Sequence, residues 1–212
     1  MTVKYDRRYY ERWYHDAPTR IATRESLDRK VRLAVAAAEL LLQRRIRRVL
    51  DVGCGEAAWR APLRRLRPGL AYRGVESSDY VIRRFGKRRN IVRGTLGDLR
   101  SLPLGSPYDL VVCADVIQYV DDAELRRGLR ELRRLTRGVA YIEAFAAEDR
   151  MEGDREGWID RPERTLRRFF RDAGFVHAGL NCWIDPRKLR DANRLELAEL
   201  SDRGRSDEAC AP

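Results

Sequence analysis

An apolar run that ends in an acidic residue and a glycine turn constrains this chain more than any other feature. Residues 49–58 read Val-Leu-Asp-Val-Gly-Cys-Gly-Glu-Ala-Ala. Glycines at 53 and 55 let the backbone turn tightly and let a ligand approach without a Cβ in the way. We therefore expect a strand, a turn and a helix in succession, with a flat, nucleotide-like ligand resting on the turn.

Two carboxylates flank this turn and bear on which ligand fits it. The spacing of the two glycines and Ala58 matches the dinucleotide fingerprint, and Glu76 stands at about the distance expected of a ribose-binding acid. Asp51 and Glu56 would, however, repel a pyrophosphate. S-adenosylmethionine has no phosphate, and its sulfonium and ammonium against one carboxylate leave it with a net positive charge. The acidic turn therefore favours S-adenosylmethionine over NAD.

Two further acids follow strand-like segments. The strand expected at 71–76 ends in Glu76, followed by Ser77, and an ionised carboxylate there can accept hydrogen bonds from both ribose hydroxyls. Further along, Asp98 can accept from an adenine amino group while Leu99 covers the ring.

Taken in order, these motifs resemble those of the class I S-adenosylmethionine-dependent methyltransferase superfamily. Residues 49–58 look like the first motif, Glu76 like the ribose acid, 97–99 like the adenine motif, and 108–120 like the fourth strand with its loop. The resemblance covers about residues 30–182. It implies S-adenosylmethionine as donor and S-adenosylhomocysteine as product. Its implied cofactor site comprises Asp51, Gly53, Gly55, Glu76, Ser77, Asp98, Leu99, Asp115 and Val116.

One position departs from the family pattern, and each acid also has an ordinary explanation. Ala57 stands where a third glycine is usual, which matters only if the backbone there has a positive φ. Asp51 is also a possible helix cap, Glu76 a strand-end carboxylate and Asp98 a turn residue. The ordered combination of all these motifs favours the cofactor site.

Strands alternating with helices predict an α/β fold: a Rossmann-like, doubly wound sheet, mostly parallel, with an antiparallel last strand and an N-terminal helical cap. Ligands in such sheets bind beyond the carboxyl ends of the strands. The expected strands are 49–52, 71–76, 91–94, 110–114, 139–145 and 175–183, with 195–197 as the antiparallel seventh. The expected helices are 25–44, 57–67, 80–87, 123–135 and 162–172.

The N-terminal segment is unusually aromatic. Tyr5, Tyr9 and Trp13 fall at helical spacing, as do Tyr10 and Tyr14, which predicts a short amphipathic helix. The helix either packs on the domain edge or forms a lid over the donor site, and its spacing does not decide between them. We divide the chain into this aromatic helix or lid at 1–20, a methyltransferase domain at 21–200, and a disordered tail at 201–212.

The candidate catalytic groups are His15, Tyr119 and Glu143. Methyl transfer from a sulfonium is an in-line displacement, so the protein chiefly positions the acceptor and removes its proton when needed. Histidine is the side chain whose usual titration range suits a base at neutral pH, which favours His15, whereas His177 reads as a strand residue. This chemistry requires no metal, and a metal-binding pair of Asp115 with Glu143 is the less favoured interpretation.

A net charge of +11 is typical of nucleic-acid-binding proteins, but the composition of this chain gives another explanation for it. Forty of the 44 basic residues are arginine, a skew typical of GC-rich coding, and many lie beside acids on helices. The run 83–89 has few acids nearby and remains a candidate anion-binding patch. Four widely spaced cysteines, no apolar segment of membrane-spanning length and no signal peptide predict a cytoplasmic protein with no membrane partner.

The sequence thus predicts a metal-independent S-adenosylmethionine methyltransferase that acts on an oxygen or nitrogen of a small metabolite. Two alternatives stay open. One is an RNA or protein methyltransferase that uses the patch 83–89. The other is a non-catalytic module that binds S-adenosylmethionine only as a signal.

Overall fold

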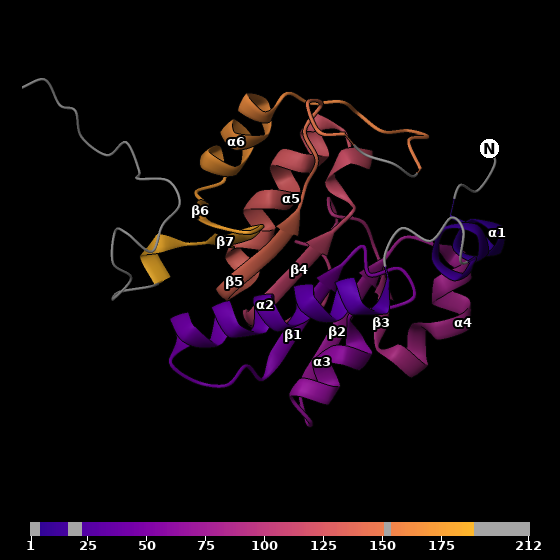
Figure 1. The fold of residues 1–212 in the computed structure, drawn as a ribbon, viewed down its shortest axis with the longest axis horizontal. Helices are drawn as coiled ribbons and strands as arrows, with labels where there is room; N and C mark the ends of the chain where they lie inside the picture. Colours follow the sequence, from indigo (N-terminus) through magenta and orange to yellow (C-terminus); the bar gives the residue numbers. More distant parts are fainter. Residues whose placement is uncertain (1–4, 17–22, 151–153, 189–212) are drawn as a thin grey trace, which may run out of the picture.

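One mixed sheet organises the molecule (Figure 1). The computed structural model describes residues 5–16, 23–150 and 154–188. The strands are β1 (Arg48–Val52), β2 (Ala71–Glu76), β3 (Ile91–Arg93), β4 (Tyr108–Ala114), β5 (Thr136–Glu143), β6 (Val176–Gly179) and β7 (Cys182–Ile184). Their order is β3-β2-β1-β4-β5-β7-β6, and β1 to β5 pair in parallel while β7 is antiparallel to both neighbours. The predicted fold class is confirmed.

Helices cover both faces of the sheet, so that it is doubly wound. The helices are α1 (Arg7–Tyr10), α2 (Arg24–Leu42), α3 (Arg60–Leu66), α4 (Asp79–Arg89), α5 (Asp122–Leu135) and α6 (Glu163–Asp172). Apolar side chains of α2, α3 and α4 pack in one cluster with the sheet, and those of α5 and α6 pack in a second. Figure 1 shows α2 and α5 on opposite sides of the central strands.

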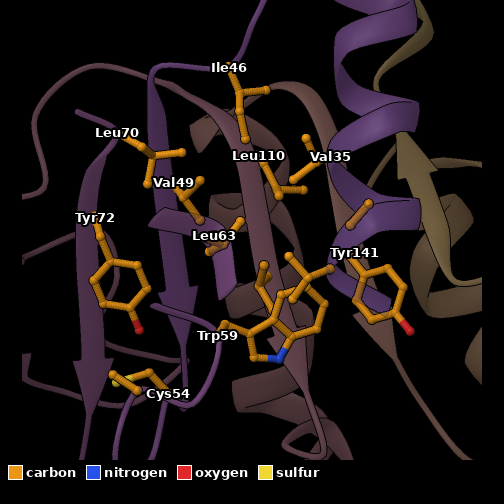
Figure 2. Close-up of a cluster of buried hydrophobic side chains, with 14 of the residues drawn as sticks. Val35, Ile46, Val49, Cys54, Trp59, Leu63, Leu70, Tyr72, Leu110 and Tyr141 are labelled. Atoms are coloured by element: carbon orange, nitrogen blue, oxygen red, sulfur yellow. The ribbon is translucent and has the colours of Figure 1, made fainter. Parts of the chain in front are cut away.

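Successive side chains of the central strands point to opposite faces of the sheet and so pack in alternate clusters. In β1, Val49 belongs to the α2 cluster and Leu50 to the α5 cluster, and in β4 Leu110 and Val111 divide in the same way. All four side chains are fully buried, and each contributes about 1.5–3 kcal/mol relative to an exposed position. Figure 2 shows Val49 and Leu110 packing with Val35 of α2. The central strands are therefore rigid supports for the loops at their carboxyl ends.

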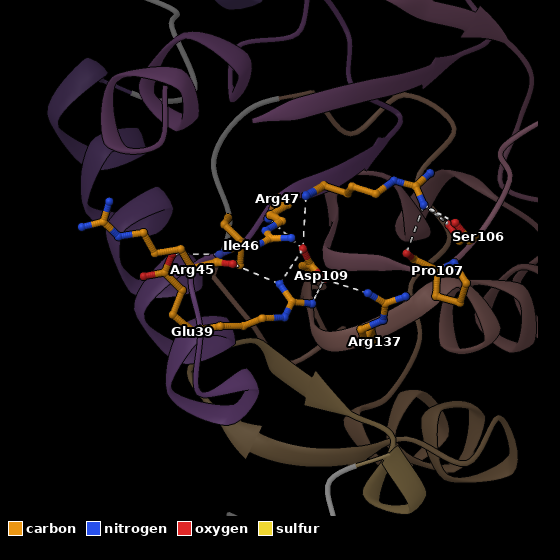
Figure 3. Close-up of polar contacts among 10 residues, drawn as sticks. Glu39, Arg45, Ile46, Arg47, Ser106, Pro107, Asp109 and Arg137 are labelled. Carbon is orange, nitrogen blue, oxygen red and sulfur yellow. Dashed lines mark hydrogen bonds and ion pairs between the residues drawn. The ribbon is translucent and has the colours of Figure 1, made fainter. Parts of the chain in front are cut away.

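A buried ion cluster lies at the other end of the central strands, where β1 and β4 begin (Figure 3). Asp109, which is 1% exposed, accepts from the guanidinium of Arg44 at 2.6 Å and from the backbone N–H groups of Arg47 and Arg48 at 2.7 and 3.2 Å. A guanidinium nitrogen of Arg137 lies 3.5 Å from Oδ1 of Asp109. Burial opposes ionisation of Asp109, but the bonds from Arg44 and Arg47 prevail and hold its pKa below the usual value. The cluster ties α2 to the start of β4.

The last part of the sheet differs from the sequence prediction. Residues 175–183 do not form one strand; they form the β6–β7 hairpin, and β7 is the antiparallel strand. Leu180 and Asn181 both have positive φ, 50° and 62°, so the chain reverses there. Asn181 was the available signal, because asparagine tolerates the left-handed region better than most residues. The strand predicted at 195–197 and the tail at 201–212 lie outside the described residues.

Two features at the N-terminal side also differ from the periodicity. The helix expected from residue 57 begins only at Arg60, since Ala57 takes a left-handed φ of 63° that interrupts a helix. The aromatic segment is helical, but after α1 it continues as a π-helix over Glu11–His15. Within the ranges that the structure describes, no helix is both long and apolar enough to cross a membrane.

Candidate active site

The turn after β1 lies against the loop after β4, and this contact demands glycine. Gly53 and Gly55 have positive φ values of 67° and 50°. A Cβ on Gly53 would lie 2.2 Å from Cγ2 of Val116, far inside van der Waals contact. The N–H groups of Gly53 and Cys54 donate to the carbonyl of Val75 at 2.8 and 3.1 Å, which holds the turn over the end of β2.

Ala57 shares this strained backbone and departs from the family pattern at a position that matters. Its φ of 63° costs an L-residue about 1–2 kcal/mol, while its buried methyl contributes only about 0.8 kcal/mol. We expect Ala57→Gly to raise the free energy of unfolding by up to about 1 kcal/mol in urea titrations. The control Ala38→Gly, buried within α2, should lower it by about 1–2 kcal/mol. Equal losses in both variants would contradict the strain at Ala57.

Glu76 ties the glycine turn to the end of β2. It is 6% exposed. Its Oε1 accepts from the N–H groups of Ser77 and Ser78, both at 2.9 Å, and its Oε2 accepts from the N–H of Gly55 at 2.8 Å. A carboxylate has about four acceptor positions, so one position on Oε2 is open to a ligand. The same side chain thus shapes the turn and faces whatever binds on it.

Asp51 lies beneath the turn in an apolar environment. It is 2% exposed and accepts from the hydroxyl of Tyr72 at 2.6 Å. Burial raises the pKa of Asp51 to about 7, an effect that the Tyr72 bond opposes and the charge of Glu76 reinforces. The carboxyl is therefore poised to lose a proton when a cation binds nearby.

This raised pKa predicts a pH-dependent stability. Because the pKa of Asp51 is higher in the folded than in the unfolded chain, its favourable contribution is present below about pH 4 and is lost as the pH rises to about 7. Asp51→Asn should therefore gain free energy of unfolding relative to the wild type across that range, by about 1–4 kcal/mol. Urea titrations from pH 4 to 8 measure this difference.

Asp109→Asn is the matched control, because its pKa is lowered. The contribution of Asp109 is present above about pH 4 and is lost only as the pH falls further. The difference between Asp109→Asn and the wild type should therefore stay flat from pH 5 to 8. A flat difference for Asp51→Asn as well would contradict the raised pKa of Asp51.

A cavity of about 240 Å³ opens at this edge, beyond the carboxyl ends of the strands. Its wall contains most of the predicted site residues: Gly53, Gly55, Glu76, Ser77, Asp115, Val116 and Tyr119. The wall is completed by Tyr5, Tyr9, Tyr10, Tyr14, Gly94, Thr95, Leu96, Val120 and Glu124. Segments that are far apart in the sequence thus meet around one space.

Three predicted cofactor residues lie outside this wall. Asp51 is buried beneath it. Asp98 is exposed and accepts from the N–H of Thr95 at 2.9 Å, so it stabilises its own turn. Leu99 is fully buried in the α5 cluster, and Leu96 takes the place at the cavity wall that was expected of Leu99. The turn at 95–101 rotates these side chains away from the positions that the motif suggested.

The N-terminal segment both packs on the domain and covers the cavity. Tyr10 is 3% exposed and belongs to the α2 cluster, where its ring stacks on Tyr80 at 5.7 Å between centroids. The hydroxyl of Ser78 donates to the carbonyl of Tyr5 at 2.6 Å. Removing this segment therefore removes part of the core, contrary to the expectation for a lid alone. Whether it also acts as a lid stays a prediction.

The π-helix decides which aromatic residues face the cavity. The N–H of Asp16 donates to the carbonyl of Glu11, five residues earlier, at 2.9 Å. This wide turn places Tyr14 near both Tyr9 and Tyr10, with ring centroids 6.3 and 5.4 Å apart, whereas Trp13 does not line the cavity. Regular helical spacing had grouped Trp13 with Tyr9. Single π turns are frequent at functional sites.

The comparisons with known proteins agree with this geometry. A family model described as a methyltransferase domain matches residues 49–138, from β1 to the start of β5. The chain contains a class I S-adenosylmethionine-dependent methyltransferase domain. No curated protein matches the chain.

Solved structures share the fold of this methyltransferase domain at low identity. An S-adenosylmethionine-dependent methyltransferase from Archaeoglobus fulgidus is 21% identical over 73% of this chain and 70% of its own, with a TM-score of 0.56. Magnesium protoporphyrin IX methyltransferase from Synechocystis PCC 6803, solved with S-adenosylhomocysteine, is 19% identical over 81% and 86%, with a TM-score of 0.58. Human N-acetylserotonin methyltransferase with S-adenosylmethionine is 18% identical over 80% and 56%, with a TM-score of 0.50.

The three candidate catalytic residues of the methyltransferase domain are not brought together. His15 is half exposed and its Nε2 lies 3.3 Å from Oε2 of Glu56, outside the cavity wall. Glu143 is also outside the wall, and both its oxygens accept from Nζ of Lys30 at 2.6 and 2.8 Å. Lys30 carries no motif, so sequence reasoning gave no sign of this pair. Because neither His15 nor Glu143 lines the cavity, neither is placed to reach an acceptor there.

Tyr119 and Asp115 are the titratable groups that do reach the cavity beside the β4 loop. Burial raises the pKa of Tyr119, so its hydroxyl keeps its proton and donates to the carbonyl of Asp154 at 2.8 Å. This disfavours Tyr119 as a base. Burial and the charge of Glu143 raise the pKa of Asp115 to about 6, while Lys30 opposes the shift. Among the described residues, no cluster of three or more His, Cys, Asp or Glu residues could hold a metal ion.

Proposed function

We propose that the chain transfers a methyl group from S-adenosylmethionine to an oxygen or nitrogen of a small molecule held in this cavity. One observation carries the proposal. The glycine turn, Glu76 and Asp115 line a single cavity at the carboxyl edge of a methyltransferase domain, beneath a roof of tyrosines.

We assign the donor to the part of the cavity formed by β1 and β2. The turn at Gly53 and Gly55 lines this part of the cavity and receives the methionine part, and the open acceptor position on Oε2 of Glu76 suits a ribose hydroxyl. Asp115, together with the buried Asp51 once a cation draws off its proton, supplies the negative potential that a sulfonium and an ammonium require.

We assign the adenine to the wall formed by Gly94, Thr95 and Leu96, with Glu124 in place of Asp98 as the acceptor for its amino group. Glu124 lines the cavity, whereas Asp98 does not. Its Oε1 accepts from the N–H of Gly97 at 2.9 Å, which leaves Oε2 for a ligand. Glu124 stands at the start of α5 and belongs to no sequence motif, so only the folded chain indicates it.

The chemistry asks little of the protein beyond positioning. The sulfonium is already an activated donor, and the transfer is an in-line displacement in which a well-oriented acceptor gains most of the rate. A tyrosine roof that excludes water shields the donor and holds the acceptor. Magnesium protoporphyrin IX methyltransferase and N-acetylserotonin methyltransferase, which share the fold, are named for small acceptors.

Labelled methyl transfer into fractionated extract of the source organism tests the proposal. The purified chain and methyl-labelled S-adenosylmethionine are incubated with small-molecule, RNA and protein fractions, and label is followed in each. We expect label in the small-molecule fraction only, with equimolar S-adenosylhomocysteine. Label in the RNA or protein fraction would show that the acceptor is RNA or protein and not a small molecule. Tight donor binding without transfer to any fraction would indicate a non-catalytic module.

The basic patch at 83–89 predicts weak RNA binding at most. None of its residues lines the cavity, and guanidinium groups of Arg84, Arg88 and Arg89 lie against the ring of Phe85 at 5.4, 5.5 and 3.8 Å. Filter binding should show no submicromolar affinity for RNA at physiological salt, because binding through phosphate contacts weakens steeply as salt rises. Submicromolar retention there would promote RNA as the acceptor.

A further inference from the structure

The cavity has a charge opposite to that of the chain. The chain carries 44 basic and 33 acidic residues. Of the described residues that line the cavity, three are carboxylates, Glu76, Asp115 and Glu124, and none is Lys, Arg or His. None of the three is ion-paired with a described basic residue; Lys30, whose charge acts on Asp115, pairs with Glu143. In so basic a chain, an exclusively acidic wall points to a ligand with positive charge.

The donor accounts for only part of this charge. S-adenosylmethionine has a net charge of +1, because its carboxylate cancels one of its two cations. The three wall carboxylates, with Asp51 beneath them, exceed that charge even when the raised pKa values of Asp51 and Asp115 are allowed for. A negative potential therefore remains for the second ligand. An acceptor with a carboxylate or phosphate would be repelled, since like charges in a poorly solvated cavity are costly.

The roof of the cavity has the composition that binds organic cations. Tyr9, Tyr10 and Tyr14 form a triangle of rings with centroids 5.4–6.3 Å apart, and Tyr119 contributes a fourth ring from the β4 loop. Burial raises the pKa of Tyr9, so its phenol stays neutral. Neutral aromatic rings around a site attract ammonium groups through their electron-rich faces. Rings and carboxylates thus select the same class of ligand.

We propose that the methyl acceptor is an amine, cationic in solution, and that nitrogen is the atom methylated. This rests on the proposed function. The bound ammonium first loses a proton to water, and the freed lone pair attacks the methyl carbon. A C–N bond forms while the C–S bond breaks, with its electron pair remaining on sulfur. Each turnover yields one methylated ammonium, one S-adenosylhomocysteine and one proton released to solvent.

Titration of the S-adenosylhomocysteine complex with charge-matched probes tests the inference. The probes are choline and benzyltrimethylammonium, each against its neutral isostere with carbon in place of nitrogen, and 3,3-dimethylbutanoate as the anion. We expect at least one cation to bind about tenfold or more tightly than its isostere, and the anion not to bind. If no cation is preferred over its isostere, or if the anion binds, the inference is overturned.

A pair of variants separates cation recognition from general packing. Tyr14 is 39% exposed, so Tyr14→Leu should fold normally. It should weaken binding of the preferred cation about three- to thirtyfold without changing the affinity for the isostere or for S-adenosylhomocysteine. Trp13→Leu, one residue away and outside the cavity wall, should change none of these. An equal loss for cation and isostere in Tyr14→Leu would contradict recognition of charge by the rings.

The two proposals fail in distinguishable ways. If S-adenosylhomocysteine itself does not bind, the proposed function falls. If it binds and label is transferred only to hydroxyl or carboxylate acceptors, the methyltransferase stands and the amine acceptor is wrong.

Discussion

Glu76→Gln should weaken binding of S-adenosylhomocysteine by about ten- to a hundredfold in calorimetric titrations. Two acceptor positions on Oε1 are used by the N–H groups of Ser77 and Ser78, and one on Oε2 by Gly55, so Oε2 can accept a single further charge-assisted bond, from a ribose hydroxyl. Such a bond contributes about 1.5–3 kcal/mol. The amide should also lower the free energy of unfolding, by about 1–3 kcal/mol, because its NH2 opposes backbone donors.

A ligand-side control separates the ribose contact from this loss of stability. The wild type should bind the 2′,3′-dideoxy analogue of S-adenosylhomocysteine about as weakly as Glu76→Gln binds the parent compound, and the variant should hardly distinguish the two ligands. Asp79→Asn, three residues further on and ion-paired with Arg93, should keep full affinity. A variant that still discriminates the two ligands as the wild type does would show that Glu76 is not the ribose acid.

Deletion of residues 1–16 should abolish turnover and lower the free energy of unfolding by about 3–5 kcal/mol. Tyr10 is buried in the core, and loss of a buried aromatic side chain costs about that much. Loss of turnover follows because four of the five tyrosines at the cavity belong to this segment. Thermal melting, urea titration and methyl transfer on the same preparation measure both effects.

Tyr10→Phe is the companion variant, because it keeps the ring and removes only the hydroxyl. It should retain a melting temperature close to that of the wild type, which would place the stability of the segment in ring packing. A truncated chain that melts like the wild type would contradict the packing of Tyr10. A truncated chain with full turnover would contradict the role of the tyrosines as a roof.

The part of the cavity wall formed by the glycine turn and Glu76 was predictable from the sequence because its signals are local. Gly53 and Gly55 mark a turn through their own backbone freedom, and Glu76 ends a strand of only six residues. The order of strands and helices then places these positions on one edge of a parallel sheet. In the structure, Gly53, Gly55, Glu76, Asp115 and Val116 line one cavity.

The candidate acid–base groups were less predictable, because their environment depends on partners far away in the sequence. His15 and Glu143 were chosen for the chemistry of their side chains, but one lies beside Glu56 and the other beside Lys30, 113 residues earlier. Asp98 and Leu99 matched a motif, yet the turn that holds them points one to solvent and the other to the core. The spacing of neighbouring residues predicts neither these ion pairs nor the directions in which the side chains of Asp98 and Leu99 point.

What the sequence by itself determined is the fold class, the glycine turn and the acid at the end of β2, since periodicity and turn chemistry are properties of a few neighbouring residues. Only the tertiary structure decided that a π turn brings Tyr14 to the cavity wall and that Glu124 and not Asp98 lines the cavity. It also decided that no Lys, Arg or His among the described residues lines this cavity. These outcomes depend on how segments distant in sequence pack together, where small changes of backbone angle redirect whole side chains. The character of the cavity is therefore a property of the assembled sheet edge.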